Sequence, residues 1–268
     1  MSQNAIPLKH ADGEYLVTAI VGDIPVDLVI DSGSVSTMLG DQNCKAKSCP
    51  VSAYIEDHPL KTAPRHVAVF GSQTETYHWT RDEFRLGKNI FSPSYEFGAI
   101  DSLRITDGVS TPFNTFGLLV DGPGKSFWSQ MPTVPRKWSI RLGDNPTLVL
   151  GDVDKTVPII APLLPNQSMP YYIIPSTLNG TKYQCIVDTG ATASYFPSSL
   201  AHLKNEDVTI TLGNNPSTQV HLTETIRSGD NANFTDILGE GNILLGNTWM
   251  KGRTLNFNME TQTFGISS

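Results

Sequence analysis

The sequence has few cysteines, no long apolar run and no cluster of positive charge. These absences argue against several common classes of protein. The chain contains only three cysteines, and no run approaches the roughly 20 apolar residues that a membrane-spanning helix needs. Charged residues make up 17% of the sequence, and the net charge is −7. Because no lysine and arginine cluster offers a positive field, we expect neither nucleic acid nor a membrane as a partner. No apolar segment follows the N-terminus, so we expect no signal peptide in this chain.

The three cysteines predict one small disulfide loop and one buried thiol. Cys44 and Cys49 bracket a polar segment, which favours a short disulfide and an oxidising compartment. Zinc would need about four ligands, and no second pair of cysteines or histidines completes such a set, so we expect no metal. Cys185 lies in an apolar run and is expected to be unpaired and inert.

Short strand patterns dominate the rest of the sequence. Segments such as "EYLVTAIVG", "RHVAVFGS", "TLVLGDV" and "RTLNFNM" are rich in β-branched and aromatic residues and are bounded by turn formers. Helix patterns are few, in "PSSLAHLKN" at 197–205 and in "GKSFWSQM". The sequence therefore predicts a mainly β protein with few short helices.

One pattern occurs twice. "LVIDSGSV" at 28–35 returns as "CIVDTGAT" at 185–192, which places Asp31 and Asp188 157 residues apart. Later in each half comes an apolar run closed by glycine, "TFG" at 115–117 and "ILLG" at 243–246. A doubled β unit explains this repetition, so we predict two lobes, residues 1–153 and 154–268, related by a pseudo-twofold axis.

A second motif, "VDGPGKSF" at 120–127, ends like a phosphate-binding P-loop. The glycine that such a loop needs five positions before Gly124 is replaced by Leu119, and Pro132 interrupts the segment that would form the helix. We therefore expect no nucleotide, and no cofactor of any kind.

Two aspartates brought together by a pseudo-twofold axis would have a definite chemistry. Close carboxyls cannot both ionise cheaply, so the pair shares one proton. The ionised partner can take a proton from water while the protonated partner gives one to a carbonyl oxygen. Hydroxyls at Ser32 and Thr189 would reach across to the other lobe, and Gly33 and Gly190 would let the backbone pass close to the carboxylates.

With these motifs the chain resembles a pepsin-like aspartic protease over nearly its whole length. "VIDSGS" and "IVDTGA" are similar to the two catalytic motifs of that family, "AVFGS" to its active-site flap, and Cys44 and Cys49 to its small first-lobe disulfide. The resemblance implies a bilobal fold and hydrolysis of extended peptides at acidic pH. It implies these site residues: catalytic Asp31 and Asp188; supporting Ser32, Gly33, Ser34, Thr189 and Gly190; and substrate-binding Phe70, Gly71 and Ser72 on the flap, with Gly33 and Gly190 beneath the substrate.

Several positions depart from the family pattern. The flap residue that is usually tyrosine is Phe70, and the tryptophan that usually bonds it is Met38. Ala191 stands where serine or threonine follows the second motif, whereas the first motif keeps Ser34. Thr115 replaces a common aliphatic residue. We expect a flap that packing alone holds in place.

The competing hypothesis is a pepsin-like binding or inhibitor protein without catalysis. Such proteins commonly lose an aspartate or its glycine, and this chain keeps both sets, which favours the enzyme. A subunit of a symmetric dimeric protease conflicts with two motifs in one chain, so we expect a monomer. Possible glycosylation sites at Asn166, Asn179 and Asn233 favour a secreted or extracellular protein, with a vacuole as the alternative.

Overall fold

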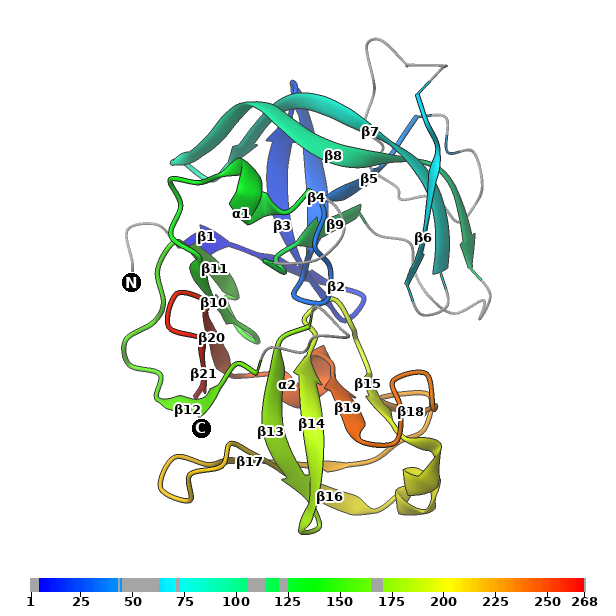
Figure 1. The fold of residues 1–268 in the computed structure, drawn as a ribbon, viewed down its shortest axis with the longest axis vertical. Helices are drawn as coiled ribbons and strands as arrows, with labels where there is room; N and C mark the ends of the chain where they lie inside the picture. The colour runs from blue at the N-terminus through cyan, green and yellow to red at the C-terminus, as the bar shows by residue number, and fades with distance from the viewer. Residues whose placement is uncertain are drawn as a thin grey trace.

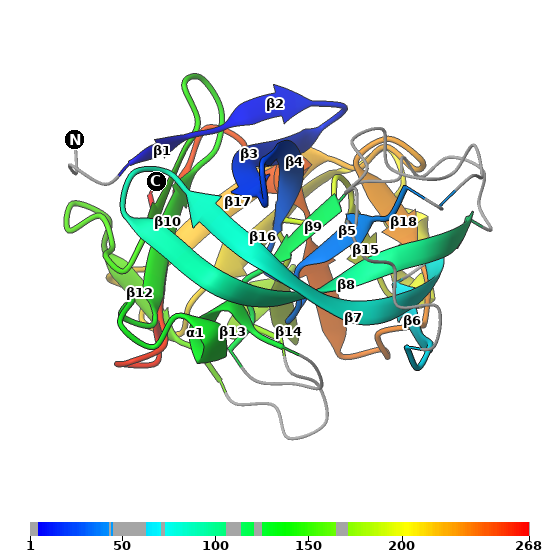
Figure 2. The same ribbon diagram turned by 90° about the horizontal axis from the view of Figure 1, so that it is seen from above.

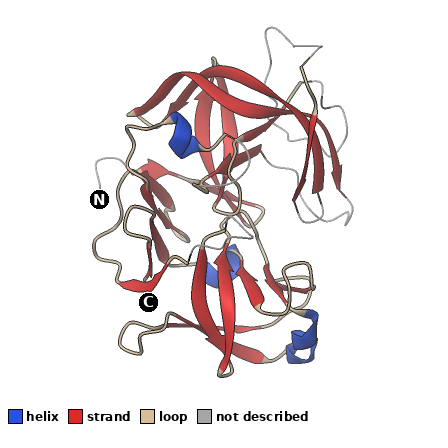
Figure 3. Ribbon diagram, viewed as in Figure 1, coloured by secondary structure: helices blue, strands red, loops and turns tan. Residues whose placement is uncertain are grey.

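The computed structural model describes residues 5–42, 44, 63–70, 73–105, 114–120, 125–164 and 171–267. These residues form three β-sheets and a few short helices (Figures 1 and 3), which confirms the prediction of a mainly β protein. An eight-stranded sheet fills the upper part of Figure 1 and a seven-stranded sheet the lower part. A six-stranded sheet lies beside both.

The eight-stranded sheet belongs to the first half of the chain. Its order is β2-β3-β4-β9-β5-β8-β7-β6, and β3 also pairs with β7, so the sheet curls back on itself. β7 and β8 are its longest strands and run side by side (Figure 2). The bounds are β2 (Lys9–Ala11), β3 (Glu14–Val21), β4 (Ile24–Asp31), β5 (Met38–Gly40), β6 (His66–Phe70), β7 (Gln73–Leu86), β8 (Ile90–Ile105) and β9 (Asn114–Gly117).

The seven-stranded sheet belongs to the second half. Its order is β17-β16-β13-β14-β19-β15-β18. Asn179, one of the predicted glycosylation sites, is exposed at the β13–β14 turn with a φ of 50°. The bounds are β13 (Ile173–Leu178), β14 (Thr181–Val187), β15 (Ser194–Phe196), β16 (Asp207–Leu212), β17 (Val220–Thr225), β18 (Ala232–Phe234) and β19 (Asn242–Leu245).

The six-stranded sheet takes strands from both halves, in the order β1-β11-β10-β20-β21-β12. Its central pairing, β10 with β20, joins Trp138 to Phe257 across the two halves. The boundary predicted between residues 153 and 154 therefore falls inside a shared sheet, between β11 and β12. The bounds are β1 (Ile6–Pro7), β10 (Lys137–Arg141), β11 (Thr147–Leu150), β12 (Ile159–Pro162), β20 (Thr254–Asn258) and β21 (Thr263–Ile266).

The helices are each about one or two turns long. α1 (Phe127–Gln130) lies where "GKSFWSQM" predicts a helix, and the Ser126 hydroxyl caps it by accepting a hydrogen bond from the Ser129 N–H. The predicted helix at 197–205 is a 3₁₀-helix, η1 (Ser198–Leu203). α2 (Asn247–Met250), directly after β19, was not predicted. No helix among the described residues is long and apolar enough to cross a membrane.

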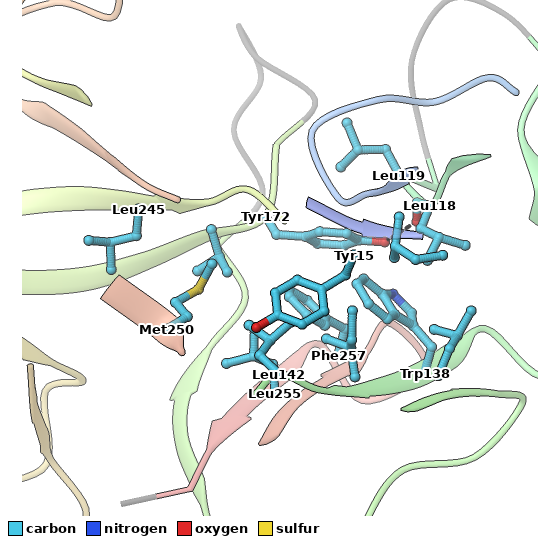
Figure 4. Close-up of a cluster of buried hydrophobic side chains, with 14 of the residues drawn as sticks. Tyr15, Leu118, Leu119, Trp138, Leu142, Tyr172, Leu245, Met250, Leu255 and Phe257 are labelled. Atoms are coloured by element: carbon cyan, nitrogen blue, oxygen red, sulfur yellow. Dashed lines mark hydrogen bonds between the residues drawn. The ribbon is translucent and has the colours of Figure 1, made fainter. Parts of the chain in front are cut away.

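One hydrophobic core joins the three sheets (Figure 4). Trp138 stacks on Phe257 at 4.1 Å between ring centroids, and Tyr172 packs against the same phenylalanine at 5.0 Å. The Tyr172 hydroxyl donates a 2.7 Å hydrogen bond to the carbonyl of Leu118, directly after β9. Because this core is continuous, the ends of β4 and β14 are held in a fixed relation to each other.

Candidate active site

Each of the two repeated motifs follows a buried strand. β4 ends at Asp31 and runs parallel to β9, with Asp31 opposite Gly117. β14 ends just before Asp188 and runs parallel to β19, with Val187 opposite Leu245. The apolar residues before each aspartate fit these strands, since the last three residues before each aspartate are all buried, on both faces of the sheet. The two glycine-closed runs, 115–117 and 243–246, are thus the partners of the motif strands.

The two turns bind each other reciprocally. The Ser32 hydroxyl donates to the Val187 carbonyl at 2.8 Å and accepts from the Thr189 N–H at 2.9 Å. The Thr189 hydroxyl donates to the Ile30 carbonyl at 2.7 Å and accepts from the Ser32 N–H at 3.1 Å. Both side chains are fully buried. Four hydrogen bonds, two from each side, therefore fix the turns as a pair, as the sequence predicts for these hydroxyls.

The glycines of both motifs leave room for the opposite carboxyl. A Cβ atom on Gly33 would lie 2.7 Å from Oδ2 of Asp188, and one on Gly190 would lie 2.6 Å from Oδ1 of Asp31. Any larger residue would therefore displace an aspartate. This crossed arrangement places Asp31 and Asp188 face to face, and both keep part of their surface accessible.

Hydrogen bonding to the two carboxyls is unequal. Asp31 accepts from the Gly33 N–H at 2.7 Å and from the Ser34 hydroxyl at 2.6 Å. Asp188 accepts from the Gly190 N–H at 2.9 Å, and Ala191 has no hydroxyl to offer it. Donors stabilise the ionised form of a carboxyl. The negative charge therefore favours Asp31, and the shared proton favours Asp188.

The pKa shifts follow this asymmetry. Burial raises the pKa of Asp188 well above its usual range, and the negative charge of Asp31 raises it further. Burial also raises the pKa of Asp31, but hydrogen bonds from Ser34, Gly33 and Asp188 oppose that rise. Two carboxyls with separated proton affinities can act as an acid and a base at the same pH.

A third carboxyl lies behind the pair. Glu14, on β3, is 5% exposed and accepts hydrogen bonds from the Thr192 hydroxyl and, at 3.0 Å, from the Asn247 amide. The same amide donates to the Thr189 carbonyl at 2.9 Å. Burial raises the pKa of Glu14 to about 8, and the negative charge of Asp31 adds to the shift. Glu14 thus ties the first half of the chain to the loop after Asp188.

The β6–β7 hairpin carries a fourth carboxyl. β6 ends at Phe70 and β7 begins at Gln73, so a hairpin forms where the flap was predicted. Val67 and Val69, on one face, are 66% and 68% exposed, whereas Glu75 on the other face is only 3% exposed. Burial raises the pKa of Glu75 to about 7, and the charge of Asp31 contributes to the rise. The covered face of the hairpin is therefore electrostatically coupled to the aspartates.

The remaining predicted residues have mixed outcomes. Gly71, Ser72 and Cys49 lie outside the described residues, and the side chain of Phe70 is not described, so the flap contacts and the Cys44–Cys49 disulfide stay predictions. Cys185 is buried and free, as expected. Among the described residues, no group of three or more histidine, cysteine or acidic side chains is placed to hold a metal ion.

Sequence reasoning missed Glu14, Glu75, Tyr77 and Asn247. Tyr77 packs with Met38, Ile100 and Leu103. A Cβ on Gly98 would lie 2.9 Å from the Tyr77 ring, so this glycine leaves room for it. No sequence signal marked these residues. Glu75 and Tyr77 lie on the same face of β7, and that this face is covered depends on tertiary structure.

No protein-family model matches the chain, and no curated protein matches it.

Proposed function

We propose that the protein is an aspartic endopeptidase that hydrolyses extended polypeptides at acidic pH. The observation that carries the proposal is the crossed pair of turns, in which Asp31 and Asp188 face each other and Ser32 and Thr189 bind reciprocally. The reciprocal bonds hold in contact two carboxyls that cannot both ionise cheaply, and carboxyls with proton affinities perturbed in this way cluster at functional sites.

The chemistry would use one water and both aspartates. Asp31 is the ionised partner and takes a proton from the water. At the same time the oxygen of that water attacks the peptide carbonyl carbon. Asp188 gives its proton to the carbonyl oxygen, which stabilises the tetrahedral intermediate. The intermediate collapses when the carbon–nitrogen bond breaks, the nitrogen takes the proton from Asp31, and Asp188 recovers its own. The products are a carboxylic acid and an amine, and the balance requires no metal, cofactor or covalent intermediate.

We propose a pepsin-like bilobal architecture to go with this activity. It is supported by the match between β4 with β9 and β14 with β19, parallel pairs that each end at an aspartate motif. Residues 1–153 and 154–268 would form the lobes, with the substrate between them beneath the β6–β7 hairpin. We propose a monomer that acts outside the cell or in a vacuole, because the polar cysteine pair and the glycosylation motifs suit such compartments.

The test is cleavage of a peptide library between pH 3 and 7, with and without a statine-type mimic of the tetrahedral intermediate. Cleavage that peaks below neutral pH and stops with the mimic would support the proposal. Tight binding of peptides without cleavage at any pH would favour the non-catalytic binding protein instead. Neither binding nor cleavage would reject both hypotheses.

A further inference from the structure

Glu75 is a described acidic residue whose burial the proposed chemistry does not explain. It lies in β7 on the covered face of the β6–β7 hairpin, opposite Ala68 of β6 and Leu103 of β8. Both neighbours are apolar. Only 3% of the Glu75 surface is exposed. Its Oε2 atom nevertheless has no hydrogen-bond partner among the described residues. A buried carboxyl without a partner is costly, so such groups call for a specific explanation.

No described cation compensates this carboxyl. Arg104 lies opposite Thr74, one position out of step with Glu75, and therefore on the other face of the strands. His66 is opposite Tyr77 and packs on its ring at 5.5 Å. The charge that acts on Glu75 is the negative charge of Asp31, and Glu75 in turn raises the pKa of Tyr77.

The negative charge of Asp31 and the unpaired Oε2 atom of Glu75 together create a place where a cation is favoured. A lysine or arginine side chain between them would pair with the unsatisfied Oε2 and would be attracted by Asp31 as well. A substrate peptide that lies under the hairpin would bring its side chains to this position. The acidic net charge of the whole chain adds a weak attraction of the same sign.

We propose that Glu75 is a specificity residue that receives a lysine or arginine side chain of the peptide substrate. The proposal rests on the proposed function, since it assumes that a peptide lies between the hairpin and the aspartates. Glu75 would take no part in bond breaking. It would select where along a polypeptide the aspartates act, by favouring the register that puts a basic side chain beneath the hairpin.

The proposal also predicts a pH dependence. In the free protein Glu75 has a pKa of about 7 and is largely protonated at the acidic pH of the proposed reaction. A bound cation would lower that pKa, so binding of a basic peptide would release a proton. The preference for basic peptides should therefore grow as pH rises from about 5 towards 7.

The experiment compares matched peptides that carry lysine or norleucine at one position at a time. For the wild-type protein, one position should show a ratio of kcat/KM that favours lysine. Glu75→Gln should lower that ratio about tenfold or more, because it removes a buried charge-assisted pair. It should also abolish the rise of the ratio with pH. Glu75→Asp should restore part of the preference, because it restores the charge.

The matched control is Glu83→Gln, on the same strand but partly exposed and paired with Arg85. It should leave the ratio unchanged. If Glu75→Gln changes the ratio by less than twofold at every position, the proposal is wrong. A loss of activity that is equal for both peptides would also overturn it, and would indicate that Glu75 acts on the fold or as a neutral hydrogen-bond donor to the peptide backbone.

A binding measurement separates this proposal from the proposed function. Calorimetry with uncleavable statine-type peptides containing lysine or norleucine needs no turnover. Preferential lysine binding that is lost in Glu75→Gln would support the role of Glu75 even if no peptide is cleaved. Cleavage without any Glu75-dependent preference would leave the endopeptidase proposal standing and reject this one. If no peptide binds at all, both are rejected.

Discussion

The two loops that begin at Asp31 and at Asp188, counted as their first residues, share a backbone plan but differ in their side-chain hydroxyls. In both, the second residue binds across to the other loop and the third is a glycine against the opposite carboxyl. The fourth residue is Ser34 in the first loop, where it bonds Asp31, and Ala191 in the second. The shared features therefore hold the two loops together, whereas the differing ones decide which aspartate keeps the proton.

At the fifth residue of the two loops, the second loop carries the hydroxyl and the first loop lacks one. The first loop has Val35, which is buried and apolar, and the second has Thr192, whose hydroxyl donates to Glu14. The hydroxyl of the second loop is thus turned away from its aspartate and towards a carboxyl of the first half. This contact stabilises the position of the loop, whereas the hydroxyl of Ser34 stabilises the charge of Asp31.

The largest expected effect comes from removing either carboxyl. Asp31→Asn and Asp188→Asn should each lower kcat/KM by about 10²–10⁴-fold or more, because each loses one of the two proton-transfer partners. Circular dichroism and thermal unfolding should show an intact fold. Peptidase assays on both variants make the test. A folded variant with near-wild-type turnover would remove the basis for the proposed function.

The next largest effect is a loss of stability when the reciprocal hydrogen bonds between the two loops are removed. Thr189→Val and Ser32→Ala should each lower the free energy of unfolding by about 1–3 kcal/mol, because each leaves a buried N–H and a buried carbonyl unpaired. Urea unfolding measures the loss. Thr223→Val is the control, since its hydroxyl bonds Thr209 on an exposed part of β17, and it should change stability by less than about 0.5 kcal/mol. If the control loses as much free energy of unfolding as the test variants, the reciprocal bonds stabilise the protein no more than an exposed hydrogen bond does.

The burial of Glu14 against the second loop should appear as a pH dependence of stability. Burial raises the pKa of Glu14 from its ordinary value of 4.5 to about 8, so the folded protein retains a proton that the unfolded chain releases. Stability from this source is complete below about pH 4.5 and falls as pH rises to about 8, by at most about 1.4 kcal/mol per pKa unit.

Glu14→Gln should remove that dependence. Relative to wild type, the variant should therefore gain stability as pH rises from 4.5 to 8, as measured by unfolding at several pH values. Glu224→Gln, at an exposed position of β17, is the control and should follow the wild-type curve. Parallel curves for wild type and Glu14→Gln would contradict the assigned protonation of Glu14.

The smallest expected effect is a shift in the pH profile of kcat/KM when the fourth residue of either loop, Ser34 or Ala191, is changed. Ser34→Ala should raise the pKa of Asp31 and move the acidic limb of the kcat/KM profile to higher pH. Ala191→Ser should lower the pKa of Asp188 and move the alkaline limb to lower pH. Each should change the rate at the optimum by only several-fold. If both changes move the same limb, the assignment of the proton to Asp188 is wrong.

Local patterns predicted much of the fold. The nearly continuous apolar run at 14–21 gave a strand that is buried on both faces. The alternating apolar residues at 207–212 gave a strand as well, because one covered face requires a period of two. The helix at 197–205 was placed correctly but is a 3₁₀-helix, since one or two turns are too short for propensity to decide the type. α2 has no cap signal and follows a glycine directly, and packing of Trp249 and Met250 in the core forms it.

The two aspartates, their glycines and the two hydroxyls that bind across could be identified from the sequence alone, because a repeated motif carries its own geometry from one half to the other. Only the tertiary structure decided the rest of the site. Glu14 and Glu75 look like ordinary strand residues, and their proton affinities rise because distant strands bury them beside Asp31. Desolvation and charge depend on what surrounds a group in space, and a linear pattern does not contain that information.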